Sequence, residues 1–277
     1  MNLKTISLLT LLFFSPQAHA YRLDEHERLT LSAFTAIQSC IEGSFYENPL
    51  QSMLVAVVNG NLNEDRNVLN KWFRFSHFYH PHWQDSGSGL FRSNSRSRIL
   101  QAASKIAPGA PATAKWLGAL LHHIQDMTVP LHVIPVNHFW TDGFEKFTTS
   151  FSGALAFESC DLLVEAALRA TPTELHQAVS EDTLRSSLND HLLASSPSGL
   201  KIPLTWFWEE GVNGDFGRYG VLGNSFGMTW ISALGRPLRI PQHEFARFKR
   251  ERLEAAERAT QIILMRAWLS GVFDAAQ

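Results

Sequence analysis

An apolar helical pattern that contains ionisable side chains is the feature that most constrains the fold. From Ala112 to Met127, apolar residues recur at helical spacing with little interruption, which is typical of a helix buried at the centre of a domain. His122 and Asp126 lie four residues apart in this segment, so both project from one face of the helix. Burying a carboxylate is costly unless a cation or strong hydrogen-bond donors compensate it. The pattern therefore predicts a central helix with a metal ion beside it.

A simpler interpretation of this helix is that His122 is a hydrogen-bonded core histidine and that Asp126 caps or pairs with a neighbour. A third potential ligand favours the metal, because Pro130 ends or kinks the helix and His132 can then turn back toward the same cavity. Seven of the twelve histidines lie between residues 77 and 138, beside acids and without cysteine pairs, which is typical of a catalytic metal site. His123 is an alternative to His122 as the ligand, and helical spacing alone does not choose between them.

Two further segments combine histidines with acids, and each is a weak signal by itself because surface acids near a histidine are common. In the first segment Glu64 and Asp65 precede His77, and in the second His138 is followed by Asp142 and Glu145. Together with the helix, these segments supply enough ligands for more than one metal ion.

Most of the remaining chain is predicted to form helices joined by polar loops. Helical patterns cover residues 29–37, 150–170 and 245–269, and the last has charges on its expected outer face at Arg250, Glu251, Arg252, Glu254, Glu257 and Arg258. Gly, Pro, Ser and Asn mark two long loops, 80–96 and 195–225. Because no strand pattern of comparable length, internal repeat or linker occurs, we expect an all-α, single compact multi-helix domain.

The N-terminus has the pattern of a secretory signal peptide. Lys4 is followed by an apolar run from Ile6 to Phe14 and by Ala18-His19-Ala20, which predicts cleavage after residue 20. The run is too short for a membrane anchor, which needs about 20 apolar residues. We therefore expect a signal peptide over 1–20 and a secreted or periplasmic catalytic domain over 21–277 that begins at Tyr21.

Charge and cysteine content narrow the class of protein further. A net charge of −2 argues against general electrostatic binding of nucleic acid, which normally requires a basic surface. We therefore expect no stable nucleic-acid partner. Cys40 and Cys160 are the only cysteines. In an oxidising compartment they could form one disulfide, or they could remain as two buried thiols.

The sequence resembles the zinc-dependent phospholipase C family, whose relatives include fungal zinc nucleases specific for single strands. The family has an Asp before a His-Phe-Tyr segment, and Asp65 precedes His77-Phe78-Tyr79 here. Its most specific motif, a His and an Asp four residues apart followed by Pro-x-His, is matched by His122, Asp126 and 130–132, which favours His122 over His123. The resemblance runs from Tyr21 to the terminal helix around 252–260, with no matched motif between about 165 and 245.

This resemblance implies a mostly helical fold around a cleft that holds three zinc ions. One ion would be bound by Asp65, His77, His122 and Asp126, and a second by His132, His138 and Glu145. The third would be bound by the amine and carbonyl of Tyr21 and by His26, with Asp126 shared as a bridge. Asp65 would also orient or deprotonate the attacking water. The family has a His four residues before its last acid, whereas Thr141 occupies that position before Glu145, so Asp142 remains an alternative to Glu145.

The activity implied is hydrolysis of the phosphodiester of glycerophospholipids by a monomer at a membrane interface, giving diacylglycerol and a phosphorylated head group. Aromatic residues that could contact lipid are Trp72, Phe73, Phe75, Trp83 and Trp206-Phe207-Trp208, although they could equally be core residues. Alternatives are a zinc nuclease or nucleotidase of the same superfamily, in which aromatic residues stack on bases, and a non-enzymatic exported zinc-binding protein.

Overall fold

The computed structural model describes residues 23–41, 47–66, 77–82, 95–110, 112–136, 142–151, 153–154, 156–195, 199–212, 215–233 and 235–273. The predicted signal peptide, Tyr21, His138 and the aromatic residues Trp72, Phe73, Phe75 and Trp83 lie outside these ranges.

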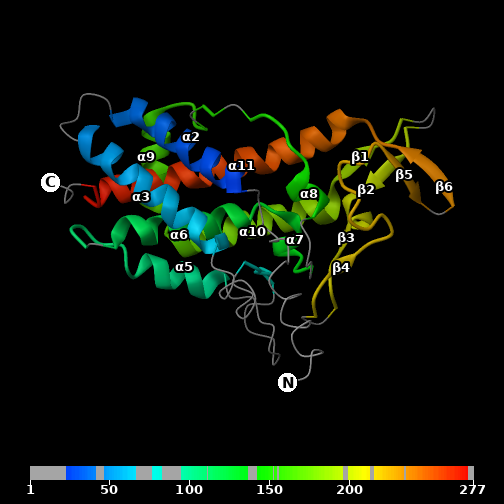
Figure 1. Cartoon of the computed structure of the whole chain (residues 1–277), viewed down its shortest axis with the longest axis horizontal. Coiled ribbons are helices and arrows are strands. Elements are labelled where there is room, and N and C mark those ends of the chain that lie inside the picture. The colour runs from blue at the N-terminus through cyan, green and yellow to red at the C-terminus, as the bar shows by residue number, and fades with distance from the viewer. Residues whose placement is uncertain are drawn as a thin grey trace, which may run out of the picture.

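The fold is mainly helical, as the sequence predicts. The helices are α2 (Leu23–Ile41), α3 (Glu47–Arg66), α5 (Ser95–Ala103), α6 (Thr113–Asp126), α7 (Pro130–Val133), α8 (Gly143–Lys146), α9 (Cys160–Arg169), α10 (Pro172–Asn189) and α11 (Gln242–Leu269). The predicted helix over 112–127 is α6, and it is in contact with α2, α3, α5, α10 and α11. Figure 1 shows α11, the longest helix, running from the helical part of the molecule to its other end. Among the described residues, no helix is both long and apolar enough to span a membrane.

Three small antiparallel hairpins lie at that other end (Figure 1). They pair β1 (His191–Leu193) with β2 (Lys201–Pro203), β3 (Trp208–Glu209) with β4 (Arg218–Tyr219), and β5 (Trp230–Ala233) with β6 (Arg236–Arg239). A short 3-10 helix, η1 (Leu204–Trp206), follows β2. The predicted loop 195–225 therefore contains strands of these hairpins. The sequence did not indicate them, because strands of two to four residues are too short to show an alternating pattern.

The core consists of two apolar clusters. One is formed by α2, α6, α9 and the second half of α11, and includes Ile37, Leu121 and Ile263. The other lies under the hairpins, is rich in aromatic residues and includes Phe207 and Trp208, whose side chains are buried. These two residues are therefore core residues and not lipid contacts, while Trp206 is partly buried against the same cluster.

The predicted helix over 150–170 is wrong in its first half. Helix α9 begins at Cys160, where the Ser159 hydroxyl accepts a hydrogen bond from the Leu162 amide at 3.3 Å. Gly153 has a φ of 63°, in the left-handed region, which a right-handed helix does not use. The backbone of Ala154 and Ala156 bonds instead to the side chain of Gln261 on α11, at 2.9 Å in both cases. Tertiary contacts thus replace the helical hydrogen bonds that this segment could have formed.

Two charges predicted for the outer face of the terminal helix are buried, which corrects that part of the prediction. Arg252 is 6% exposed and donates to Asp182 at 3.0 Å. Glu257 is 2% exposed and accepts a hydrogen bond from Ser32 of α2. Both partners belong to other helices, so pairing over a long sequence distance compensates the burial of these charges.

Cys40 and Cys160 form a disulfide, with their Cα atoms 5.3 Å apart. The bond joins the end of α2 to the start of α9 across 120 residues. It settles the choice that the sequence left open between a disulfide and two thiols.

Candidate metal centre

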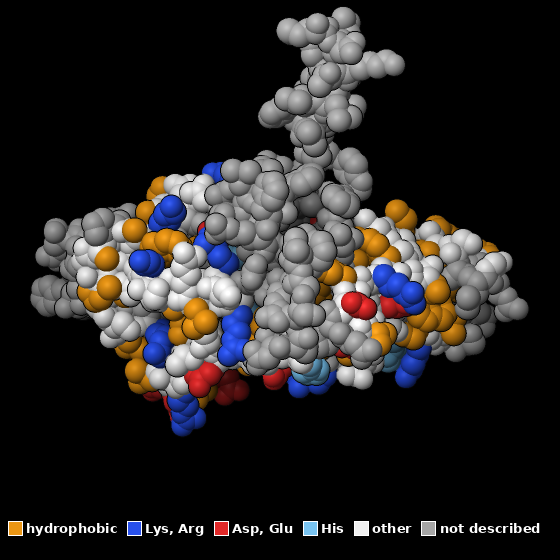
Figure 2. Space-filling model, turned by 90° about the horizontal axis from the view of Figure 1, so that it is seen from below, with side chains coloured by type: hydrophobic (Ala, Val, Ile, Leu, Met, Phe, Trp, Pro, Cys, Tyr) orange, Lys and Arg blue, Asp and Glu red, His pale blue; other side chains and the backbone are white. Residues whose placement is uncertain are grey.

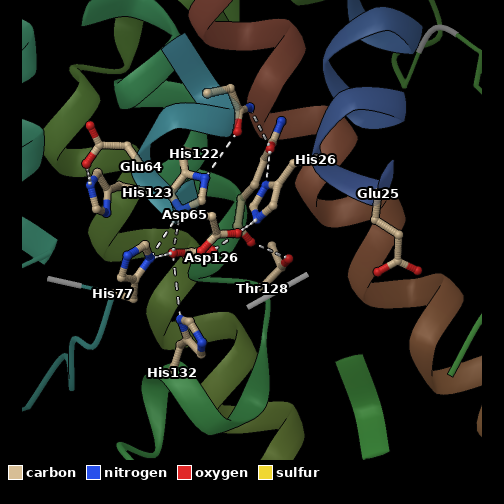
Figure 3. Close-up of polar contacts among 12 residues, drawn as sticks. Glu25, His26, Glu64, Asp65, His77, His122, His123, Asp126, Thr128 and His132 are labelled. Carbon is tan, nitrogen blue, oxygen red and sulfur yellow. Dashed lines mark hydrogen bonds and ion pairs between the residues drawn. The ribbon is translucent and has the colours of Figure 1, made fainter. Parts of the chain in front are cut away.

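Two glycines let the backbones of α3 and α6 touch, and this crossing brings polar side chains of the two helices together. A Cβ atom on Gly118 would lie 2.1 Å from the carbonyl oxygen of Val57, and one on Gly60 would lie 2.5 Å from that of Lys115. Only glycine fits so close an approach. Asn61, Glu64 and Asp65 on α3 consequently lie beside His122, His123 and Asp126 on α6, as Figure 3 shows for the labelled members.

Asp126 lies at the centre of a group of imidazoles that come from four parts of the chain. Its Oδ2 lies 2.6 Å from His77 Nδ1, 3.3 Å from His122 Nε2 and 3.7 Å from His132 Nδ1, and its Oδ1 lies 3.4 Å from His26 Nε2. The Asp126 side chain is 0% exposed. Figure 3 shows these side chains pointing toward one another, whereas neighbouring Glu25 points away from the group.

The spacing of these atoms suits a metal ion. Ligands of a tetrahedral zinc, at about 2.0–2.1 Å from the ion, lie roughly 3.3 Å apart. The atoms His77 Nδ1, His122 Nε2 and Asp126 Oδ2 are separated by 2.6, 3.1 and 3.3 Å. Three buried groups of residues could each hold an ion: His26 with His122 and Asp126, Asp65 with His77 and His122, and His77 with His123 and Asp126.

Two of the histidines are oriented by amide side chains. His26 Nδ1 donates to Gln125 Oε1 at 2.7 Å, and His122 Nδ1 donates to Asn61 Oδ1 at 3.1 Å. Gln125 is itself fixed, because its amide nitrogen donates to Thr260 at 3.1 Å. Each ring therefore directs its Nε2 toward Asp126, and a hydrogen bond from the other ring nitrogen is how a metal-binding histidine is usually held.

The electrostatics of the centre show how strongly it attracts positive charge. Burial alone would lower the pKa of His122, but Asp126, Asp65 and Glu64 raise it to about 9. Burial also lowers the pKa of His77 to about 4, against the opposite effect of Asp126. Burial would raise the pKa of Asp126, yet His122, His132 and His77 lower it well below its ordinary value. The centre thus holds an ionised carboxylate that only a proton or a cation compensates.

His132 connects this group to a second pair of acids. Pro130 begins α7 after α6 has ended at Asp126, and His132 on α7 faces back toward Asp126, as its sequence position predicts. Its Nε2 lies 3.8 Å from Glu145 Oε1. Glu145 and Asp142 form a capping box at α8, in which Asp142 N donates to Glu145 Oε2 at 2.7 Å and Asp142 Oδ1 accepts from Phe144 N at 2.6 Å.

The structure brings together seven of the nine residues predicted as metal ligands. They are His26, Asp65, His77, His122, Asp126, His132 and Glu145, whereas Tyr21 and His138 lie outside the described residues. Asp142, the alternative to Glu145, caps α8, and Glu145 belongs to the same capping box.

Sequence reasoning missed Asn61 and Gln125, and gave Glu64 no role of its own. Glu64 and Gln125 each had a signal, since both lie next to a predicted ligand, and Gln125 is polar within an apolar helix.

No protein-family model matches the sequence, and no curated protein matches it either. The resemblance to zinc-dependent phospholipases C therefore rests on the motifs themselves and remains a prediction.

Proposed function

We propose that this chain is an exported zinc-dependent phosphodiesterase that hydrolyses glycerophospholipids to diacylglycerol and a phosphorylated head group. The observation that supports the proposal most is the group of buried imidazoles around Asp126, with His26 and His122 oriented by Gln125 and Asn61. A structural core gains nothing from several histidines around one carboxylate, whereas a metal centre requires them.

We assign three zinc ions to the residues that the motifs select. Asp65, His77, His122 and Asp126 would hold the first ion, and His132, His138 and Glu145 the second. The third would take His26, Asp126 and the amine and carbonyl of Tyr21, whose free amine becomes available only when residues 1–20 are removed. Bound zinc supplies Lewis-acid stabilisation of the charge that develops on the phosphate, and it makes water acidic enough to react at neutral pH.

Asp65 is the residue that we assign to the attacking water. Its side chain is 0% exposed and lies on α3, on the edge of the group formed with His77 and His122. A carboxylate there can accept a hydrogen bond from water and hold it for in-line attack on phosphorus. The bond between phosphorus and the glycerol oxygen breaks, and the proton lost by water balances the one that the leaving alkoxide takes up.

The surface favours lipid over nucleic acid as the substrate. Six of the twelve exposed large apolar residues of the described chain lie in or beside the hairpins, at Leu193, Leu200, Val212, Val221, Met228 and Trp230. Figure 2 shows apolar side chains at this end of the molecule, with Lys and Arg as well as Asp and Glu side chains among them. Exposed apolar side chains suit the interface of a phospholipid bilayer, where a monomer would dock.

The test combines metal analysis of processed protein with hydrolysis of phosphatidylcholine vesicles and of single-stranded DNA. We expect about three zinc ions per chain and lipid cleavage that a chelator abolishes. Asp126→Asn should lower lipid hydrolysis by at least about 100-fold and reduce zinc content, because Asp126 contacts several candidate ligands. His243→Gln, which alters an exposed histidine, is the matched control and should retain both.

The outcomes separate the parts of the proposal. Cleavage of DNA but not lipid would keep the metal centre and replace the substrate. Bound zinc without either activity would favour a non-enzymatic zinc-binding protein. Protein with extra residues before Tyr21 that still bound three zinc ions at full activity would refute the role of the free amine.

A further inference from the structure

His123 is a buried histidine that the proposed zinc sites do not use. It follows His122 on α6, and its ring is 0% exposed. Its Nε2 lies 3.2 Å from Glu64 Oε2 on α3. Arg98 on α5 donates two hydrogen bonds to the same carboxylate, of 2.7 and 2.6 Å. Arg98 on α5 therefore holds Glu64 on α3, and Glu64 holds the ring of His123 on α6.

The hydrogen bond to Glu64 determines which nitrogen of His123 carries the proton. An ionised carboxylate only accepts hydrogen bonds, so Nε2 donates to Glu64 and Nδ1 is left with a lone pair. The two hydrogen bonds from the Arg98 guanidinium stabilise the ionised form of the Glu64 carboxylate. Nδ1 of His123 is buried and has no hydrogen-bond partner among the described residues. Buried polar atoms nearly always have a partner, so such an atom requires an explanation.

The surroundings of His123 supply that explanation. His77, His123 and Asp126 each offer a ligand atom, and these atoms lie within 4.8 Å of one another. The His77 and His123 rings are 5.4 Å apart between centroids, and Nε2 of His77 is also buried without a hydrogen-bond partner in the described part of the chain. A histidine held by a carboxylate on one nitrogen and facing other ligands with the rest of its ring has the arrangement typical of a metal ligand.

We propose that His123 is itself a metal ligand, of the ion that His77 and Asp126 hold, and that Glu64 and Arg98 are its positioning residues. The ion is a divalent cation of borderline softness such as Zn²⁺, because the set consists of two imidazoles and one carboxylate. This inference rests on the proposed function only in that the centre must bind metal, and it does not depend on the substrate.

The first measurement is a metal titration without substrate. Protein stripped with a chelator is titrated with Zn²⁺ against a chromogenic competitor, in the wild type and in His123→Gln. The glutamine amide can still donate to Glu64, but it lacks the ring nitrogen. We expect His123→Gln to lose one bound ion or to bind it about 10–100-fold more weakly. Glu64→Gln, which removes the charge that orients the ring, should show a smaller loss.

His176→Gln is the matched control. His176 is also buried, its Nε2 is bonded to Ser95 Oγ at 2.9 Å, and its Nδ1 likewise has no hydrogen-bond partner among the described residues. It belongs to none of the groups that could hold an ion. Its replacement should leave the zinc titration unchanged, so an equal effect of both variants would overturn the proposal.

A second measurement does not depend on any variant. In ¹⁵N-labelled wild-type protein loaded with ¹¹³Cd²⁺, the Nδ1 signal of His123 should shift and show coupling to cadmium, and that of His176 should not. An unchanged His123 signal, or a zinc titration that His123→Gln does not alter, would refute the assignment. If wild-type protein binds metal through His123 but hydrolyses no phosphodiester, the proposed function fails and this inference stands.

Discussion

Replacing Gly118 with alanine tests whether the crossing of α3 and α6 builds the candidate metal centre. The added methyl carbon would lie 2.1 Å from the carbonyl oxygen of Val57 and 2.5 Å from the amide nitrogen of Asn61. Both are backbone atoms of α3, so no side-chain rotation relieves the clash. Restoring a contact of 3.0 Å requires the helices to separate by about 0.9 Å.

The magnitude follows from two opposing effects. In a helix with free space, alanine is more stable than glycine by up to about 1 kcal/mol. Overpacking of a tight core costs about 1–3 kcal/mol, so we expect the free energy of unfolding to fall by roughly 1–2 kcal/mol. The site should suffer more than the fold. Asn61 would move away from His122, whose Nδ1 donates to it at 3.1 Å, and a misplacement of about 1 Å can cost about 100-fold in rate.

Urea unfolding, zinc affinity and lipid hydrolysis together check this expectation. Gly60→Ala should act in the same direction, because its methyl carbon would lie 2.5 Å from the carbonyl oxygen of Lys115. A Gly118→Ala protein that is as stable as the wild type or more so, with unchanged zinc affinity, would refute the reasoning. It would mean that the helices separate freely and that Asn61 does not need to be held against His122.

Three further predictions follow from the geometry. Replacing Cys40 and Cys160 with alanine should lower the free energy of unfolding by about 4–5 kcal/mol, measured by urea unfolding, since the closed loop spans 120 residues. The pKa of His176 is lowered to about 3 by burial, so between pH 6.5 and 3 only the unfolded chain takes up this proton. The free energy of unfolding should therefore decrease as the pH is lowered from 6.5 to 3. His176→Gln should make this dependence on pH weaker. Glu145→Gln should reduce zinc content, measured by metal analysis, while Asp142→Asn should mainly destabilise α8; loss of zinc only in Asp142→Asn would reverse the ligand assignment.

The central helix was predictable because its signal is local. Apolar spacing over 112–127 marks α6, and the charge of Asp126 within it marks the site. Errors arose where distant partners decide the structure. Gln261 binds the backbone of Ala154 and Ala156, so the segment before Cys160 is not helical. Such contacts join residues about a hundred positions apart, and no local pattern records them.

The candidate site divides in the same way. His122, Asp126 and His132 lie within eleven residues, and their spacing alone indicates that they share a cavity. The side chains that orient them could not be found by spacing. Asn61 reaches His122 only because Gly118 and Gly60 let two helix backbones touch, and a glycine in a helical pattern does not say which helix it will contact.

Lys249 links two distant segments of the chain beside the candidate metal centre. It lies on α11, where the sequence suggests an amphipathic surface helix, yet its side chain is 0% exposed. Its Nζ donates to Glu25 Oε2 and to the carbonyl oxygen of Phe144, each at 2.9 Å. Glu25 precedes His26, and Phe144 precedes Glu145, so one ammonium group links the two segments that flank the proposed zinc ligands. A buried ammonium is stable only with such partners. The terminal helix therefore does more than cover the core, because it links two segments whose proposed zinc ligands lie about 120 residues apart.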